Sequence, residues 1–226
     1  MERNERGRLR GLSALLFFFI ALILVPISVL GQSLPKLREA QAPPLPPRAA
    51  GGGEVLLELE VGADGRVKQV RVLRTTPPYA ELLTQAVTGW SFEPARGGEE
   101  EGPVPSRVLV AGVFRGPGFY AGTSPGTPPR DADQPSSAVA YPENIVEPVY
   151  PARAYGDGVV LLELEVDVEG QIQAIRSLTS GTGFEQAAID AARRWTFRPA
   201  RPTAHGSGDS LVVVVFGFPR PVIPSR

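Results

Sequence analysis

The chain has 226 residues, enough for one or two domains. Its net charge of −1 gives it no basic field that would attract nucleic acid. It contains no cysteine and a single histidine, which excludes disulfide scaffolds, thiolate metal sites, cysteine nucleophiles and multi-histidine metal sites. We therefore expect no enzyme activity, no catalytic residue, no cofactor and no bound metal. The 25 glycines and 24 prolines indicate linkers and turns between compact units.

The N-terminus predicts a membrane anchor. Residues 1–10 carry four arginines against two glutamates, and residues 11–30 contain no charge and only two polar side chains, Ser13 and Ser28. As a helix, that run would be about 30 Å long, the thickness of a bilayer's hydrocarbon core. The preceding arginines predict a cytoplasmic tail, a transmembrane helix at residues 11–31 and a periplasmic remainder, so that the chain is a single-pass inner-membrane protein. A cleaved secretory signal, giving a secreted periplasmic protein, is the alternative.

After the anchor, the chain repeats itself. Leu45–Arg96 aligns without a gap with Tyr150–Arg201, and Val55–Val61 recurs residue for residue as Val160–Val166. Such self-similarity indicates two copies of one structural unit, the first of them degenerate at its start.

The predicted elements follow in chain order. In the first copy we expect strands near residues 54–61 and 66–73, a helix near 79–90 and a strand near 107–114. In the second, period-2 alternation predicts a strand at 160–166, and Gly170 a tight turn into a second strand at 172–178. An apolar stripe at helical spacing follows from Phe184 to Trp195, with Thr182 as the expected N-cap, and then a strand at 211–218.

The two strands of each hairpin must be antiparallel because their connection is too short for a crossover. The predicted fold class is α+β: two tandem small modules, each a three-stranded antiparallel sheet with a helix on one face. The expected divisions are a tail at 1–10, the anchor at 11–31, a Pro-rich linker at 32–44, a first module at 45–115, a Pro/Gly-rich linker at 116–140, a second module at 141–220 and a tail at 221–226.

Paired glutamates recur in both copies, as Glu58 with Glu60 and as Glu163 with Glu165. Side chains two residues apart on a strand share a face about 7 Å apart. In units this small we interpret them as a solvated face, with Arg71 and Arg176 as cross-strand ion-pair partners.

The second copy resembles the C-terminal domain of TonB-type energy transducers. The resemblance rests on Tyr150–Ala154, on Gly156 and Gly158, on the alternating strand, the hairpin glycine and the apolar helix, and on Trp195–Ala200. The order of tail, single span, Pro-rich linker and periplasmic domain is also similar. The resemblance implies that the domain binds an extended peptide of an outer-membrane transporter, which adds as a strand beside the domain's last strand. The first hypothesis is therefore a TonB-like periplasmic energy transducer or adaptor that supports transport by this transporter.

The resemblance maps the expected partner-binding residues onto two segments. One is the flanking segment Val149, Tyr150 and Pro151; the other is the last strand, with Leu211, Val212, Val213, Val214, Val215 and Phe216. An unpaired strand edge has free N–H and C=O groups, which makes strand addition physically reasonable. The alternative is that these valines form the core of a central strand, and the sequence leaves both open.

Two departures from the family suggest a second hypothesis. The family's span carries a histidine that couples it to a proton-driven motor in the inner membrane, whereas this predicted span has none. The first linker is also short, so we expect the first module to serve as a structural spacer or docking platform that carries the second outward. The alternative function is a non-energised, membrane-anchored periplasmic scaffold.

Overall fold

The computed structural model describes residues 33–46, 51–97, 102–116, 123–125, 136, 138–202 and 208–221. The predicted tail and transmembrane helix, residues 1–31, lie outside these ranges. Neither helix within them has the length and apolar character that crossing a bilayer requires. The described part is mixed α+β and mostly strand, as predicted.

Within the described ranges, the N-terminal half contains one helix and seven strands of differing length. These are β1 (Lys36–Glu39), β2 (Gly53–Val61), β3 (Val67–Arg74), α1 (Tyr79–Thr88), β4 (Ser91–Glu93), β5 (Ala95–Arg96), β6 (Pro103–Val104) and β7 (Ser106–Phe114).

The C-terminal half has the same order of long elements. It contains β8 (Thr123–Pro125), β9 (Tyr141–Val146), β10 (Gly158–Val166), β11 (Ile172–Ser177), α2 (Glu185–Ala192), β12 (Thr196–Arg198) and β13 (Ser210–Phe218). β2, β3, α1, β4 and β7 thus correspond to β10, β11, α2, β12 and β13.

The long strands of both halves form one sheet. Its order is β11-β10-β13-β7-β2-β3, so the last strands of the two halves lie side by side in the middle. β13 and β7 are parallel, whereas every other neighbouring pair in this sheet is antiparallel. The prediction of two separate three-stranded sheets is therefore wrong. Each predicted sheet exists, but their last strands join edge to edge, because strand pairing satisfies the backbone groups that each sheet would leave exposed.

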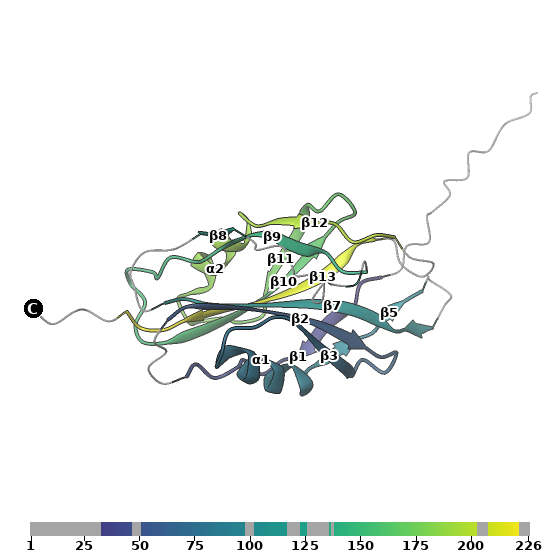
Figure 1. Ribbon diagram of the computed structural model, residues 1–226, viewed down its shortest axis with the longest axis horizontal. Coiled ribbons are helices and arrows are strands. Elements are labelled where there is room, and N and C mark those ends of the chain that lie inside the picture. The colour runs from purple at the N-terminus through teal and green to yellow at the C-terminus, as the bar shows by residue number, and fades with distance from the viewer. Residues whose placement is uncertain are drawn as a thin grey trace, which may run out of the picture.

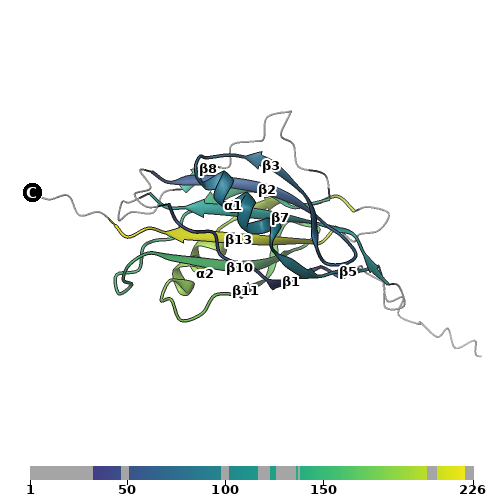
Figure 2. The same cartoon turned by 90° about the horizontal axis from the view of Figure 1, so that it is seen from below.

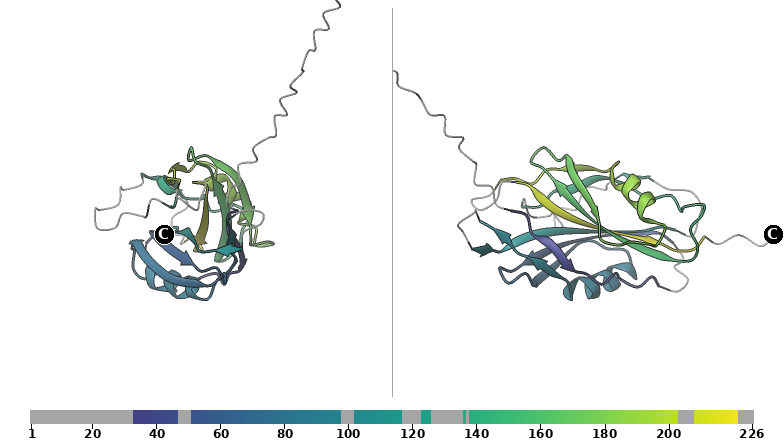
Figure 3. Two further views of the ribbon diagram at one scale, coloured as in Figure 1. Left: turned by 90° about the vertical axis from the view of Figure 1, so that its right-hand side faces the viewer. Right: turned by 180° about the vertical axis from the view of Figure 1, so that it is seen from behind.

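This parallel junction places the two helices on opposite faces. β7 and β13 run in the same direction and have corresponding neighbours, so a rotation of about 180° about an axis parallel to them brings one half onto the other. Such a rotation turns the sheet over and exchanges its two faces. Accordingly α1 lies below the sheet and α2 above it (Figure 1), and the view from behind shows the same layering (Figure 3). The expectation that the first half is a spacer that carries the second outward is thus wrong, because a continuous sheet makes the halves one body. A docking role of the first half stays a prediction.

Each helix covers only part of its face of the sheet. The rest is covered by a leading segment, which is the stretch before the first long strand of a half: β1 before β2, and β9 before β10. β1 pairs with β4 on the α1 face, and β9 pairs with β12 on the α2 face. One core therefore joins Leu37 of β1 and residues of α1 to Leu161, Val213 and Val215 of the other half. The opposite core joins α2 and β9 to Leu56 and neighbouring residues of the first half. Figure 2 shows β1 beside β11, at the far edge from β3.

The helix in the second half is shorter than predicted. α2 ends at Ala192, so Trp195 follows the helix, although its indole is buried as expected of a core anchor. Phe184, not Thr182, occupies the N-cap position. Thr182 still serves the helix start, since its hydroxyl accepts from the Phe184 N–H at 3.4 Å and its own N–H donates to Glu185 Oε1 at 2.8 Å.

The predicted hairpin glycine is required by its backbone and by its surroundings. Gly170 has φ +81°, and a Cβ there would lie 2.3 Å from the carbonyl oxygen of Phe197. Gly65 is equivalent, with φ +73° and 2.0 Å to the carbonyl oxygen of Phe92. The turn therefore needs glycine twice over: for positive φ and for the close approach of the strand that follows the helix.

We predict that Gly170→Ala lowers the free energy of unfolding by more than Gly181→Ala does. Gly181 has φ +76° but open space where a Cβ would stand. Gly181→Ala should lower the free energy of unfolding by about 1 kcal/mol, because alanine is strained in the left-handed conformation. Gly170→Ala should cost at least about 1 kcal/mol more, because a clash is added to that conformational cost. Urea denaturation of both variants measures the difference; equal losses would contradict the close approach.

We also predict that the halves do not fold independently. Fragments 33–116 and 136–226 should each lack a cooperative thermal transition, because each exposes apolar side chains that the other half covers. The matched control is the intact chain cleaved once at a protease site inserted between residues 126 and 130, which should stay associated and retain its transition. Circular dichroism and size-exclusion chromatography provide the readouts. A monomeric fragment with a sharp two-state transition would contradict the prediction.

Candidate binding surfaces

The predicted edge strand is a central strand. β13 pairs with β10 along its whole length, from Ser210 with Val166 to Phe218 with Gly158. On its other side, Val212 to Gly217 pair with Leu109 to Phe114 of β7. Its backbone is therefore hydrogen-bonded on both sides, and its side chains are buried. The expectation that Leu211, Val212, Val213, Val214, Val215 and Phe216 line a free edge is wrong, because the first half occupies that edge.

The flanking segment lies at one end of the molecule. Val149 is 55% exposed, whereas the Tyr150 ring packs edge-on against Phe184 at 5.4 Å between centroids. The Tyr150 hydroxyl donates to the carbonyl of Gly156 at 2.7 Å. Burial is the main cause that raises the pKa of this phenol, and the nearby Asp157 carboxylate adds to it. Tyr150 thus fixes the loop, and Val149 is left available for contact.

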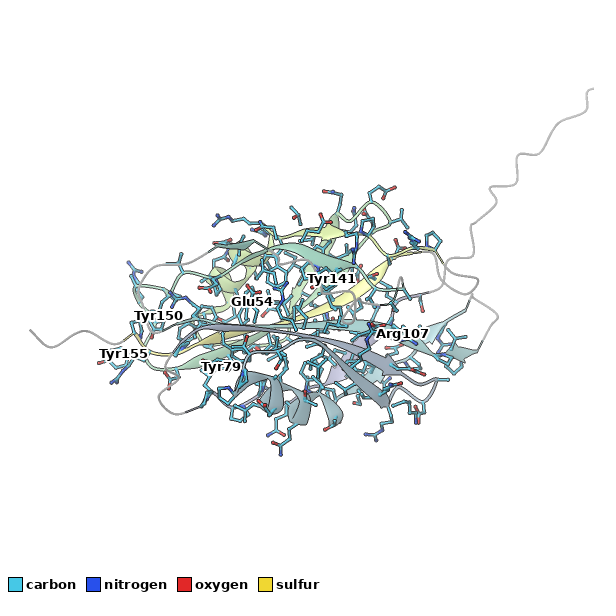
Figure 4. The ribbon with its side chains drawn as sticks, viewed as in Figure 1. Glu54, Tyr79, Arg107, Tyr141, Tyr150 and Tyr155 are labelled. Atoms are coloured by element: carbon cyan, nitrogen blue, oxygen red, sulfur yellow. The ribbon has the colours of Figure 1, made fainter. Side chains whose placement is uncertain are left out.

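Sequence reasoning missed the most exposed aromatic side chain at this end. Tyr155 is 94% exposed and lies beside Tyr150, far from Arg107 at the opposite end (Figure 4). An aromatic ring between the alanine and the glycine that precede a strand was the only available signal. Val149 and Tyr155 are thus the large apolar side chains that this segment leaves exposed.

The two inner glutamates, Glu58 and Glu163, are buried, in contrast to the predicted solvated face. Glu58 is 1% exposed and Glu163 5%. The reason is that each lies on the face opposite to its own helix, where the other half's leading segment covers it. Leu56 lies on the same face as Glu58, and Leu161 lies on the same face as Glu163. These buried leucines were the sequence signal that the glutamates are buried too. Their partners Glu60 and Glu165 remain in contact with solvent.

Each buried glutamate accepts a backbone N–H from a segment outside its own sheet. The Leu37 N–H of β1 donates to Glu163 Oε1, and the Ser136 N–H donates to Glu58 Oε2 at 2.9 Å. The expected ion pairs are present: Arg176 binds Glu163 through two nitrogens, and Arg71 Nη1 lies 3.9 Å from Glu58 Oε2. These carboxylates therefore hold the leading segments on the sheet.

Charge compensation determines the pKa of Glu58. Burial is the largest single influence and raises it, but the hydrogen bonds from Ser136 and Arg107 and the charge of Arg107 outweigh burial. The pKa of Glu58 is therefore lower than its ordinary value of 4.5. The Arg107 guanidinium lies 3.0 Å from Glu58 Oε1, and this contact was not expected from the sequence.

The outer edges of the long sheet are β3 and β11. Among the described residues each pairs with one long strand only. β3 carries three cationic side chains along its eight residues, whereas β11 carries one, Arg176. Charges on an edge strand disfavour pairing with another chain, so β11 is the less protected edge. Within the described part, no group of histidine, aspartate and glutamate side chains is arranged to hold a metal ion.

Residues 146–214 match the family model described as the Gram-negative bacterial TonB protein C-terminal. This range comprises the helix α2 and the strands β10, β11, β12 and most of β13. The match supports a TonB C-terminal domain in this part of the chain, which is less than half of its length. No curated protein matches the chain.

We predict that Glu58 makes stability depend on pH. Because its folded-state pKa is lowered, the stabilisation is fully present above the unfolded value near 4.5 and is lost as the pH falls through the folded-state value. Glu58→Gln should lower the free energy of unfolding by about 1.5–3 kcal/mol at pH 7, the range for hydrogen bonds to a charged group. It should also flatten the loss of stability that the wild type shows as the pH falls from about 5 to about 3.

Urea denaturation of the wild type and the variant across this pH range measures both effects. Glu60→Gln is the matched control, since Glu60 is 40% exposed and its nearest cation, Arg107, is 3.7 Å away. It should change stability by less than about 1 kcal/mol. Parallel pH curves for the wild type and Glu58→Gln would contradict the assignment.

Proposed function

We propose that the protein is a TonB-like adaptor of the Gram-negative cell envelope that binds a partner away from the last strand of its TonB C-terminal domain. The proposed partner is an extended segment of an outer-membrane TonB-dependent transporter. The partner binds elsewhere because the chain's own first half takes the place beside the last strand. The adaptor is a membrane-anchored interaction module that is not itself energised.

One observation carries this proposal: β7 pairs in parallel with β13 over Val212–Gly217. The family resemblance would place a partner's strand at this edge. Removing β7 would also break its pairing with β2 from Gly53 to Val61 and expose the apolar side chains of both cores. Because burial of apolar surface is the dominant favourable term in folding, a short peptide does not compensate for that loss.

The proposed location follows from the sequence. A span at residues 11–31 would anchor the chain in the inner membrane, with the tail at 1–10 in the cytoplasm and the described part in the periplasm. The only histidine, His205, lies outside that span, so the span offers no imidazole for coupling to proton-driven motor subunits. This supports an adaptor that is not itself energised.

We predict that locking β7 to β13 leaves partner binding unchanged. Val110 and Val213 are opposite each other across the parallel junction, and both are buried. Since the chain has no cysteine, Val110→Cys/Val213→Cys would form its only disulfide. Transporter-derived peptides are titrated against the oxidised and the reduced forms by calorimetry. We expect equal dissociation constants, because the partner binds elsewhere.

Val110→Cys alone is the matched control for the effect of substitution. If only the reduced form binds, the junction opens and β13 captures the peptide, which overturns the proposal. If no transporter peptide binds at millimolar concentration in either form, the transporter is not the partner, and the chain is a scaffold for another envelope component.

A further inference from the structure

The two leading segments occupy equivalent places. β1 pairs with β4 through Leu37 and Phe92, and β9 pairs with β12 through Pro142 and Phe197. After β1, the carbonyl of Gln41 accepts the indole N–H of Trp90 at 3.0 Å. At the end of β9, the carbonyl of Val146 accepts the indole N–H of Trp195, also at 3.0 Å. Since both tryptophans and both partners match in the repeat, residues 39–41 correspond to residues 144–146.

Only one of these segments has a second strand beside it among the described residues. β8 pairs antiparallel with the end of β9, Thr123 with Val146 and Pro125 with Asn144. In the part of the chain that the structure describes, β1 and the residues after it pair only with β4. The equivalent place beside Glu39–Gln41 therefore lacks, within that part, the strand that β8 provides in the other half.

A groove lies at this place. It has a volume of about 240 Å³, and the leading segment lines it on one side and the hairpin of β10 and β11 on the other. Its apolar lining comes from Leu37, Ala40, Ala42, Leu161 and Leu178. The groove is small, which suits short side chains.

Burial also differs between the two places. On the side that has β8, Leu73 is 4% exposed and Ile145 is fully buried. Their equivalents beside the groove, Leu178 and Ala40, are only half-buried. Apolar surface that is covered in one half is thus accessible in the other.

The charges around the groove favour an anionic partner. Two arginines, Arg38 and Arg176, contribute to the lining, and none of the described lining residues carries a carboxylate. Glu163 already binds Arg176, whereas Arg38 is exposed. A carboxylate on the bound segment would therefore lie near Arg38.

We propose that this groove binds an extended segment of a partner protein, which pairs antiparallel with Glu39–Gln41 as β8 pairs with β9. The segment has small side chains facing the groove and an acidic residue near Arg38. This inference rests on the proposed adaptor function and names its binding site. Main-chain hydrogen bonds would supply affinity, and the small groove would restrict side-chain size.

The probe is a nine-residue peptide with the sequence of residues 119–127, Phe-Tyr-Ala-Gly-Thr-Ser-Pro-Gly-Thr, with and without an added C-terminal aspartate. It is titrated into the isotope-labelled chain and followed by amide NMR shifts. We expect saturable shifts at Glu39–Ala42 and at Leu178 and Thr179. Ala42→Trp, at an exposed position of the groove wall, should weaken binding at least tenfold.

The matched control is Gln173→Trp, an exposed position on β11 outside the groove, which should leave the affinity unchanged. Arg38→Ala should remove any preference for the aspartate peptide. Absence of saturable binding, insensitivity to Ala42→Trp, or shifts concentrated on the β11 edge or on Asn144–Val146 would each overturn the site. Concentration-dependent dimerisation that Ala42→Trp abolishes would show that the occupant is a second copy, which also overturns it.

This experiment separates the site from the proposed function. If transporter peptides bind the wild type and Ala42→Trp equally well, the function stands and the site is wrong. If the probe binds in the groove but no transporter peptide binds, the site stands and the transporter is not the partner.

Discussion

The parallel pairing of β7 with β13 is the interaction on which the rest of this structure depends. It joins two sheets of three strands into one of six, so that both last strands are paired on both sides. Because a parallel pair of equivalent strands exchanges the faces of the sheet, it also places the two helices on opposite sides. The free edges are thereby moved outward to β3 and β11.

This arrangement makes each half incomplete without the other. A helix covers part of one face, and the remainder needs the leading segment and the core of the other half. Buried Glu58 and Glu163 reflect this dependence, since each binds a backbone N–H from a segment outside its own sheet. A buried carboxylate must be hydrogen-bonded to be tolerated, so these contacts fix the position of both leading segments.

The same junction decides which strand edges of the TonB C-terminal domain are accessible in this chain. The edge at which the family resemblance implies peptide binding is internal here, and displacement of β7 would dismantle both cores. A partner must therefore use a surface that the junction leaves accessible. The end formed by Val149 and Tyr155 and the groove beside Glu39–Gln41 are two such surfaces. For the groove alone, the chain itself provides an example of the strand pairing, in β8 beside β9.

Local pattern was sufficient to predict the long strands and the helices of this protein, but not the short strands: β1 and β8 lie in segments expected to be linkers. The alternation in Val160–Val166 identified β10, Gly170 identified its turn, and the apolar stripe after Phe184 identified α2, because each of these signals arises from neighbours along the chain. The repeat predicted that both halves have the same elements. Only the tertiary structure determined how the halves meet. A run of valines such as Val212–Val215 is equally compatible with an edge strand and with a central strand. The choice depends on hydrogen bonds to β7, about a hundred residues away in sequence, and pairing over that distance leaves no local signal.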